Sequence, residues 1–177
     1  SLDRRGVRGG LGYLYWIKSC GINRFQVNQN GWYYQDHRGD VKVQDGVLFN
    51  FSIETISLIA PEILIERSSY LLPSENAHYD NNQQTLSLKF GPYPRLRGTV
   101  SYRSGDNFGM SIRYVDSELI LKPAERMRLA LNYSRLESDP FDNTAKSETN
   151  NIARIGFNYL FTPDMYCRVF LQSDSSK

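Results

Sequence analysis

The sequence predicts an all-β fold: an antiparallel up-and-down sheet of about ten strands that forms a segment of a transmembrane β-barrel. Three observations support this prediction. Apolar and polar residues alternate with a period of two along several long segments, short and long joins alternate between those segments, and aromatic residues make up 13% of the chain. With 177 residues, the chain has the length of one domain or of a piece of a larger one.

The alternation is clearest in the carboxy-terminal half. Over residues 96–103, Leu96, Val100 and Tyr102 occupy even positions, whereas Arg97 and Arg103 occupy odd positions. The same separation recurs over residues 127–134, 153–161 and 165–172. Successive side chains of a strand point to opposite faces, so each segment is predicted to have one apolar face and one polar face.

This alternation of odd and even positions predicts which side chains face lipid and which face the interior of a barrel. The lipid-facing residues are apolar or aromatic, with one cysteine among them: Leu96, Val100, Tyr102, Met127, Leu129, Leu131, Tyr133, Ile155, Phe157, Tyr159, Cys167 and Val169. The lumen-facing residues are arginines and asparagines: Arg97, Arg103, Arg128, Asn132, Arg154, Asn158 and Arg168. We also expect Arg113 on the polar face, because a wet lumen accommodates charged groups.

Glycine and proline clusters place the joins between strands. Short joins are predicted near residues 20–21, 53–56, 91–94, 122–125 and 162–164, and longer or more polar joins at 36–40, 69–83, 104–107 and 138–150. Tight turns at one end and longer loops at the other are typical of outer-membrane barrels. The alternation is least regular over residues 41–67, where Pro61 predicts an edge, a bulge or a break.

A soluble β-sandwich also alternates apolar and polar positions between frequent turns, so this fold remains an alternative. Two features favour the barrel. Residues 108–121 suit a strand of about fourteen residues, longer than the ~5–6 that are usual in sheets. Aromatic residues recur near the predicted strand ends, where an interfacial girdle would lie: Trp32, Tyr33, Tyr34, Tyr93, Tyr102, Tyr114, Tyr133, Tyr159 and Tyr166.

Composition and charge exclude several classes of protein. A formal net charge of +2, with acidic residues spread along the chain, gives poor support to nucleic-acid binding, so we expect no nucleic-acid partner. A mean hydropathy of -0.50 and the lack of a run of about 18 uncharged apolar residues exclude a transmembrane helix. The chain begins without Met or a signal-like segment, so we expect it to be part of a longer polypeptide.

The sequence predicts no catalytic, cofactor-binding or metal-binding residues. No HExxH, P-loop, GxSxG or GxGxxG pattern is present. His37 is expected in a solvated loop, and His78 lies near Glu75 and Asp80 in the predicted join 69–83, which leaves a metal or calcium site there as an alternative.

The remaining reactive groups have ordinary explanations. Asp139 and Asp142 lie in a polar join and are expected to serve solubility rather than glycosidase chemistry. Cys20 and Cys167 are far apart in the sequence and outside any CxxC pattern, so we interpret them as packed thiols rather than as a bridge or metal ligands.

The carboxy-terminal half resembles the β-barrel region of a Gram-negative outer-membrane family. The resemblance is carried by residues 100–109, 121–129, 131–135, 158–165 and 170–172, with further similarity at 4–8, at 70–74 and at Tyr79. In that family the barrel follows an amino-terminal carbohydrate-binding family 9-like domain, and members are often labelled membrane-associated hydrolases. The chain departs from the pattern in the glycine-poor segment 104–109 and in residues 137–150, which lack Leu-Pro-x-Gly.

The resemblance implies that residues 1–177 are the later part of a barrel in the cell outer membrane, without the amino-terminal domain and the closing strands. Its partners would be outer-membrane lipid and the rest of the same polypeptide, and a carbohydrate ligand would bind through the absent domain. We therefore expect a structural, anchoring or transport role, with no chemistry of its own and no cofactor. The alternatives are a soluble β-sandwich that binds carbohydrate or peptide through aromatic loops such as 31–37, and a part of a membrane-associated hydrolase whose active site lies outside this chain.

Overall fold

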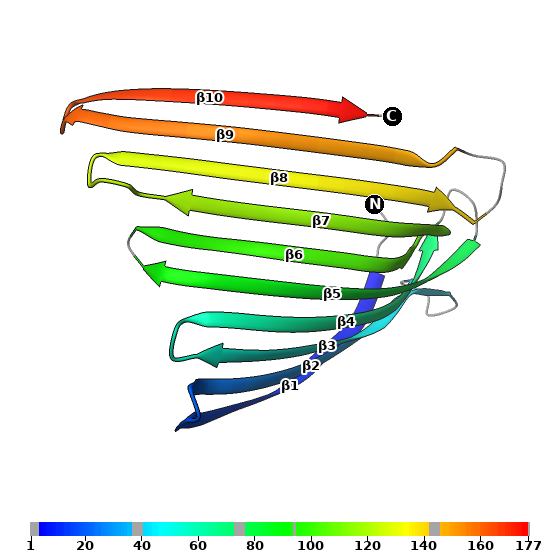
Figure 1. Cartoon of the computed structure of the whole chain (residues 1–177). Helices are drawn as coiled ribbons and strands as arrows, with labels where there is room; N and C mark the ends of the chain where they lie inside the picture. Colours follow the sequence, from blue (N-terminus) through cyan, green and yellow to red (C-terminus); the bar gives the residue numbers. More distant parts are fainter. Residues whose placement is uncertain (1–3, 37–40, 73–76, 94, 142–145, 177) are drawn as a thin grey trace.

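The computed structural model describes residues 4–36, 41–72, 77–93, 95–141 and 146–176, which form a single antiparallel sheet (Figure 1). Its strands are paired in sequence order, which confirms the all-β, up-and-down fold. They are β1 (Arg4–Ser19), β2 (Ile22–Asp36), β3 (Lys42–Thr55), β4 (Ile59–Leu72), β5 (Ala77–Tyr93), β6 (Leu96–Asn107), β7 (Met110–Leu121), β8 (Met127–Pro140), β9 (Glu148–Thr162) and β10 (Met165–Ser176). Within these ranges there is no helix long and apolar enough to cross a membrane.

Two hairpins close with two-residue turns in which both residues have positive φ. These turns are Cys20 (φ 53°) with Gly21 (φ 76°), and Phe108 (φ 48°) with Gly109 (φ 76°). Positive φ at both central positions is the type I′ conformation, which matches the right-handed twist of the flanking strands. Because residues 108–109 form this turn, β7 is 12 residues long rather than the predicted fourteen.

The ten strands place their joins at two ends of the sheet. We call the end with the Cys20–Gly21 turn the turn end, and the opposite end, where the Phe108–Gly109 turn lies, the loop end. Two predicted long joins at the loop end are wrong: β4 continues to Leu72 and β5 begins at Ala77, and β6 includes residues 104–107. The polar side chains at the loop end do not end the strands. Hydrogen bonds between the backbones of neighbouring strands can continue there, because both faces of the sheet can be solvated.

The irregular region around Pro61 is a regular strand with a local break in pairing. Pro61 lies in register with Leu88 of β5, whereas the ladder between β3 and β4 ends at Glu62. A proline has no N–H for a ladder hydrogen bond, so it is tolerated just beyond the end of one ladder.

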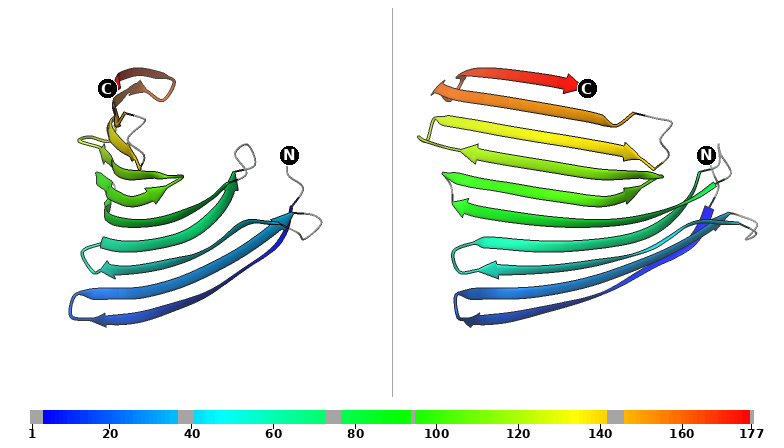
Figure 2. Two further views of the ribbon diagram at one scale, coloured as in Figure 1. Left: turned by 90° about the vertical axis from the view of Figure 1, so that its right-hand side faces the viewer. Right: turned by 45° about the vertical axis from the view of Figure 1, so that its right-hand side comes forward.

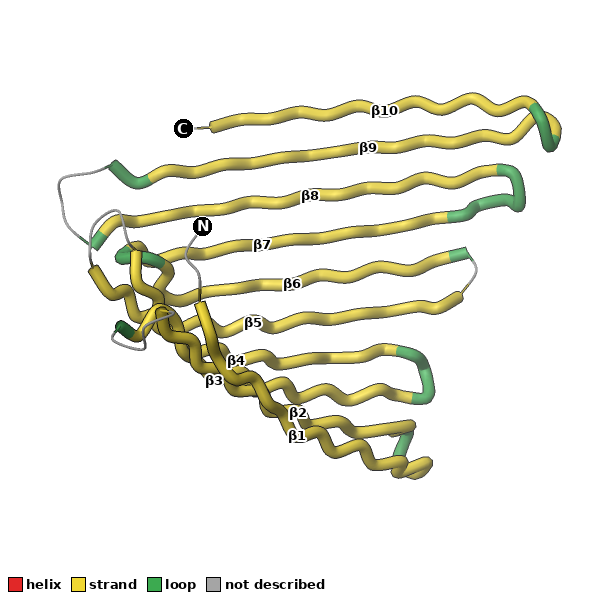
Figure 3. The backbone as a smooth tube through the Cα atoms, turned by 180° about the vertical axis from the view of Figure 1, so that it is seen from behind, coloured by secondary structure: helices red, strands yellow, loops and turns green. Residues whose placement is uncertain are grey.

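The sheet is one curled layer (Figure 2), and the view from behind shows no second layer of strands over it (Figure 3). Val43, Ile112 and Ile120 are the buried hydrophobic residues among those described. The described residues therefore form neither the two layers nor the dry core of a sandwich. β1 and β10 are the two edges of the sheet, which is not closed.

Candidate functional site

The strand register collects the predicted residues onto two faces. Directly paired residues of an antiparallel sheet project to the same side, so the register can be followed from strand to strand. Leu96 pairs with Leu121, and this row continues through Leu129, Phe157 and Val169. The twelve predicted lipid-facing residues all share this side, the apolar face, and the seven predicted lumen-facing residues all share the opposite side, the polar face.

On β4 and β5, the apolar face is the more exposed of the two. On β4, Ile59, Ile63 and Ile65 are exposed, whereas the alternating polar-face residues Glu62 and Glu66 are half-buried. β5 repeats this pattern along most of its length. The exposed fractions of Ile63 and Leu86 are 43% and 53%. Soluble proteins show the reverse order, with their charged residues outside.

Apolar residues form an oblique band across the exposed face, which we call the apolar belt. Its loop-end edge on β3 is Val47, which lies in register with Asp139 of β8. Its edge on β10 is Leu171, which lies in register with Leu131 of β8, eight residues away. Between β3 and β10, the edge of the belt is thus displaced by eight residues along the strand direction. With a rise of ~3.3 Å per residue and a spacing of ~4.8 Å between neighbouring strands, this displacement means that the strands are tilted by about 40° from the normal to the belt. Barrel strands tilt by a similar angle from the barrel axis.

Tyrosines mark part of the loop-end edge of the belt. Tyr102 is the last apolar-belt residue on β6 and is followed on that face by Ser104, and Tyr133 is followed on β8 by Arg135. Both tyrosines lie in the middle of their strands, so the prediction that they lie near strand ends is wrong. The strands continue beyond the belt, and belt edge and strand end are therefore different places.

Several other aromatic side chains do not belong to this edge. Tyr114 lies on the polar face, where its hydroxyl donates a hydrogen bond to Asp116 Oδ1 at 3.2 Å. Trp32 and Tyr34 also lie on the polar face, with their rings over Gly46 and Gly6 respectively. The side chain of Tyr93 lies outside what the structure describes.

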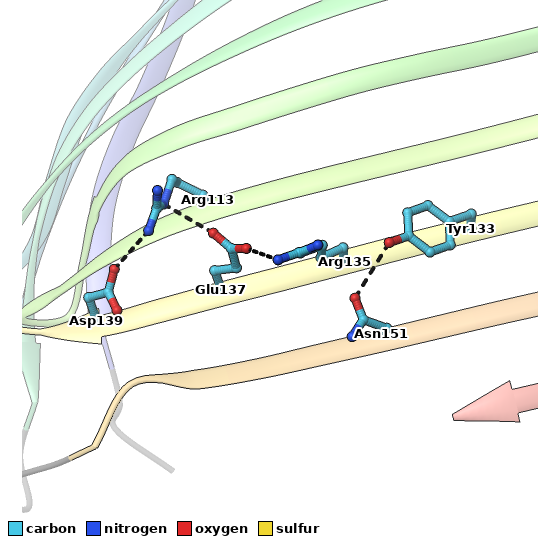
Figure 4. A network of polar contacts seen from close by, with 6 residues as sticks. All are labelled: Arg113, Tyr133, Arg135, Glu137, Asp139 and Asn151. Atoms are coloured by element: carbon cyan, nitrogen blue, oxygen red, sulfur yellow. Dashed lines mark hydrogen bonds and ion pairs between the residues drawn. The ribbon is translucent and has the colours of Figure 1, made fainter. Parts of the chain in front are cut away.

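A charged network lies on the apolar face beyond the belt, toward the loop end (Figure 4). Arg113 Nε lies 3.2 Å from Glu137 Oε2, and Arg113 Nη2 lies 3.1 Å from Asp139 Oδ2. Glu137 is also paired with Arg135. We call these four residues the polar cap. The prediction that Arg113 lies on the polar face is wrong, because Arg113 pairs directly with Glu137 and shares the parity of the belt residues of β7.

Asp139 is the member of the polar cap whose titration is shifted. It lies beyond the belt near the end of β8, where it is half-buried and 44% of its side chain is exposed. A hydrogen bond from the Ser147 hydroxyl, together with Arg113, lowers the pKa of the Asp139 carboxyl, against a smaller opposing effect of desolvation. The charged form is therefore the one that these partners stabilise.

On β2 to β5, the cations of the polar face are paired with carboxylates. Arg24 Nη2 lies 2.7 Å from Glu54 Oε2, and Lys89 Nζ lies 2.6 Å from Glu62 Oε2. Asn50 donates a further hydrogen bond to Glu62. In each of these ion pairs, a carboxylate of the polar face balances the positive charge of its partner.

On β9 and β10, two arginines of the same face are held by neutral side chains. Arg154 Nε donates to Gln172 Oε1 at 3.1 Å, and Arg168 Nε donates to Asn158 Oδ1 at 2.8 Å. These amide oxygens orient the guanidinium groups but leave their charge uncompensated. The polar face is therefore electrically uneven along the sheet.

Most described residues of the metal and aromatic-loop alternatives lie in strands. His78 lies in β5 rather than in a loop, and residues 31–36 lie in β2. No group of three or more His, Cys, Asp or Glu side chains that could hold a metal occurs within the described ranges. His37, Glu75 and Asp142 lie outside the described residues.

Both thiols are free and exposed. Cys20 lies in the two-residue turn after β1, and Cys167 lies on the apolar face of β10, in the row of Met127 and Tyr159. The interpretation of the cysteines as packed side chains is therefore wrong, because a single-layer sheet has no core in which to pack them.

No protein-family model, curated protein or solved structure matches this chain. The resemblance to an outer-membrane family stays a prediction, and the function is inferred from the two faces of the sheet.

Proposed function

We propose that this chain is the membrane-embedded wall of an outer-membrane β-barrel, with a structural, anchoring or transport role and no chemistry of its own. The observation that carries the proposal is the apolar belt, which stays exposed on one face of a single-layer sheet, while on β4 the charged residues Glu62 and Glu66 of the opposite face are half-buried. Exposed apolar surface costs about 25 cal/mol per Å² in water, and monomeric soluble proteins rarely expose patches beyond a few hundred Å². Contact with hydrocarbon removes that cost.

The oblique course of the belt supports the same function. A belt perpendicular to the barrel axis crosses tilted strands obliquely, and the displacement from Val47 to Leu171 has the expected size. The charged polar cap then lies outside the hydrocarbon layer, and the tyrosines at the belt edge lie at the level of the headgroups.

The two sheet edges indicate what else the proposal requires. Unpaired backbone groups in hydrocarbon cost several kcal/mol each, so β1 and β10 must each acquire a partner strand. We propose that the remaining strands of the same polypeptide supply these partners. A hydrolase active site or a carbohydrate-binding domain would then lie in another part of that polypeptide.

The native cysteines provide a direct test of the orientation. We propose single-cysteine variants, Cys20→Ser and Cys167→Ser, of the full polypeptide in open membrane fragments. Cys167, on the apolar belt, is expected to react with a lipid-soluble maleimide and to be protected from a charged, water-soluble one. Cys20, in a turn at the membrane surface, is the internal control and is expected to react with the water-soluble reagent.

The reverse pattern at Cys167 would contradict the proposal. Equal reactivity of both thiols with the water-soluble reagent would show that the belt is in contact with water. Migration on unboiled gels, which reports folded barrels, controls for unfolded protein in each variant.

A further inference from the structure

We propose that a basic pocket at the turn end of the polar face, formed by Arg128 and Arg168 with the turn between β7 and β8, binds a small phosphate-bearing anion. The pocket exists whether or not the chain lies in a membrane. Its location inside an enclosed lumen, by contrast, rests on the proposed function.

The pocket has a volume of about 300 Å³ and is lined by the turn 122–126 and by β8, β9 and β10. Its lining includes four cations, Lys122, Arg126, Arg128 and Arg168, and a single carboxylate, Glu125. This volume accommodates a phosphate or pyrophosphate ion with part of its hydration shell. The excess of positive charge is local, because the whole chain has a formal net charge of only +2.

The arginines are held in place by groups that do not neutralise them. Arg168 Nε donates to Asn158 Oδ1 at 2.8 Å, and its guanidinium carbon lies 5.7 Å from the centre of the Tyr166 ring. Both Nη atoms of Arg168 therefore remain available to a ligand. Arg126 Nη1 donates to the carbonyl oxygen of Phe161 at 3.3 Å, which is again a neutral acceptor.

Arg128 completes the site from the neighbouring strand. Arg128, Asn158 and Arg168 lie in one row across β8, β9 and β10, so the two arginines flank the asparagine. Two strand spacings of ~4.8 Å separate their Cα atoms, a span that two long arginine side chains bridge when they converge on one anion. Arg128 has no hydrogen-bond or ion-pair partner in the described part of the chain.

The chemistry of the pocket favours phosphate. The planar guanidinium fork matches the oxygens of phosphate and carboxylate groups, and charge-assisted hydrogen bonds of this kind are the strongest that side chains make. On β2 and β5 of the same face, Arg24 and Lys89 have carboxylate partners at 2.7 and 2.6 Å, so they cannot offer the same site. The pocket is the place on the described polar face where several arginines converge without such partners.

The test is a calorimetric titration of the full polypeptide, folded in detergent micelles, with inorganic phosphate and pyrophosphate at low ionic strength. We expect saturable binding at one site per chain. Arg128→Gln and Arg168→Gln are each expected to weaken binding about tenfold or more, since each removes a hydrogen bond to a charged group. Arg154→Gln is the matched control, because it removes one cation from the same face outside the pocket, and it is expected to change the affinity less than twofold.

Absence of saturable binding to the unsubstituted protein would overturn the proposal. An equal loss of affinity in Arg154→Gln and Arg128→Gln would also overturn it, because binding would then follow overall charge. Unboiled-gel migration identifies any variant that fails to fold. For such a variant, the milder Arg168→Lys, which keeps the charge but loses the fork, is expected to weaken binding less than Arg168→Gln.

A second arm identifies the source of the phosphate. The titration is repeated in mixed micelles containing phosphatidylglycerol or phosphatidylcholine. Competition by phosphatidylglycerol alone assigns the pocket to an anionic lipid headgroup, and lack of competition assigns it to a dissolved anion. Either result supports the phosphate chemistry. Because these measurements need no bilayer, their failure is distinguishable from failure of the cysteine test.

Discussion

The two faces of this sheet combine exposure and polarity in opposite ways. On β4, the apolar-face residues Ile63 and Ile65 are exposed, while Glu62 and Glu66 on the polar face are more covered. Both faces come from the same strands, so the difference is not one of backbone structure. This combination supports the proposal that the exposed side meets an apolar environment.

The distribution of charged residues also differs between the polar face and the polar cap of the apolar face. The ion pairs of the polar face on β2 to β5 are made across strands, as between Arg24 and Glu54. The polar cap also contains pairs across strands, but it gathers its four residues, Arg113, Arg135, Glu137 and Asp139, in one place on β7 and β8, just beyond the belt. On the apolar face, charged residues therefore lie outside the belt, whereas on the polar face they are distributed along the length of the strands.

The largest expected effect comes from placing a charge in the belt. Leu131→Arg inserts a cation into the apolar belt on β8, a change that in membrane barrels costs up to about 2–4 kcal/mol at the bilayer midplane and less toward the interfaces. Asn132→Arg places the same residue one position further, on the polar face, and is expected to cost less than about 1 kcal/mol. Urea unfolding from lipid vesicles measures both. Equal destabilisation would contradict the assignment of the faces.

A smaller effect is expected where a glycine lies beneath an aromatic ring. A Cβ added at Gly46 would lie 2.5 Å from Trp32 Cζ2 and 2.8 Å from the Arg67 carbonyl oxygen, so the backbone or the ring must move. Gly46→Ala is expected to destabilise the fold by about 1–3 kcal/mol. Gly9→Ala is the control, since nothing lies within 4 Å of its added Cβ. A shift in Trp32 fluorescence and the unfolding midpoint are the measurements, and an unchanged midpoint in Gly46→Ala would contradict this packing.

Removal of one ion pair on the polar face is expected to have a still smaller effect. Glu62→Gln breaks the pair with Lys89, whose side chain is 57% exposed, so the expected loss is about 0.5–1 kcal/mol after screening by solvent. The loss should diminish at high salt. Glu118→Gln on the same face, an exposed carboxylate, is the control and should be close to neutral. A salt-independent loss would show that hydrogen bonding, rather than charge, is responsible.

The smallest effect is a pH dependence of the polar cap. The Asp139 carboxyl has a lowered pKa in the folded state, through Ser147 and Arg113, so it releases its proton more readily than in the unfolded chain. Its stabilising contribution is therefore present above the unfolded pKa of about 3.9 and is lost as the pH falls through the lower, folded pKa. Unfolding midpoints at pH 7 and pH 3 should differ slightly less in Asp139→Asn than in the unsubstituted protein. An identical pH response would contradict this role.

Local pattern accounts for much of the fold and of the two faces. Period-two alternation placed Leu129, Leu131 and Phe157 on one side and Arg128 and Arg154 on the other, as the strand register confirms. Parity is a property of a single strand, so it needs no knowledge of neighbouring strands.

Strand ends and the exact composition of each face were harder to predict. The Asn and Gln residues at 81–83 are predicted to belong to a join but continue β5, because nothing in a polar residue prevents cross-strand hydrogen bonding. The charge of Arg113 predicts the polar face, although its position in β7 is on the same side as the belt residues of that strand. In the basic pocket, the run of charges at 122–128 was a signal in the sequence, but its proximity to Arg168 was not.

By itself, the sequence determined that the chain forms long antiparallel strands and which side chains alternate along each of them, because both follow from residues that are neighbours in the chain. Only the tertiary structure decided how the rows of different strands align, and hence the oblique belt, the polar cap and the meeting of Arg128 with Arg168. The physical reason is that register is set by hydrogen bonds and packing between strands that can lie far apart in the sequence. A two-residue change of register between two strands preserves every alternation while moving the rows relative to one another.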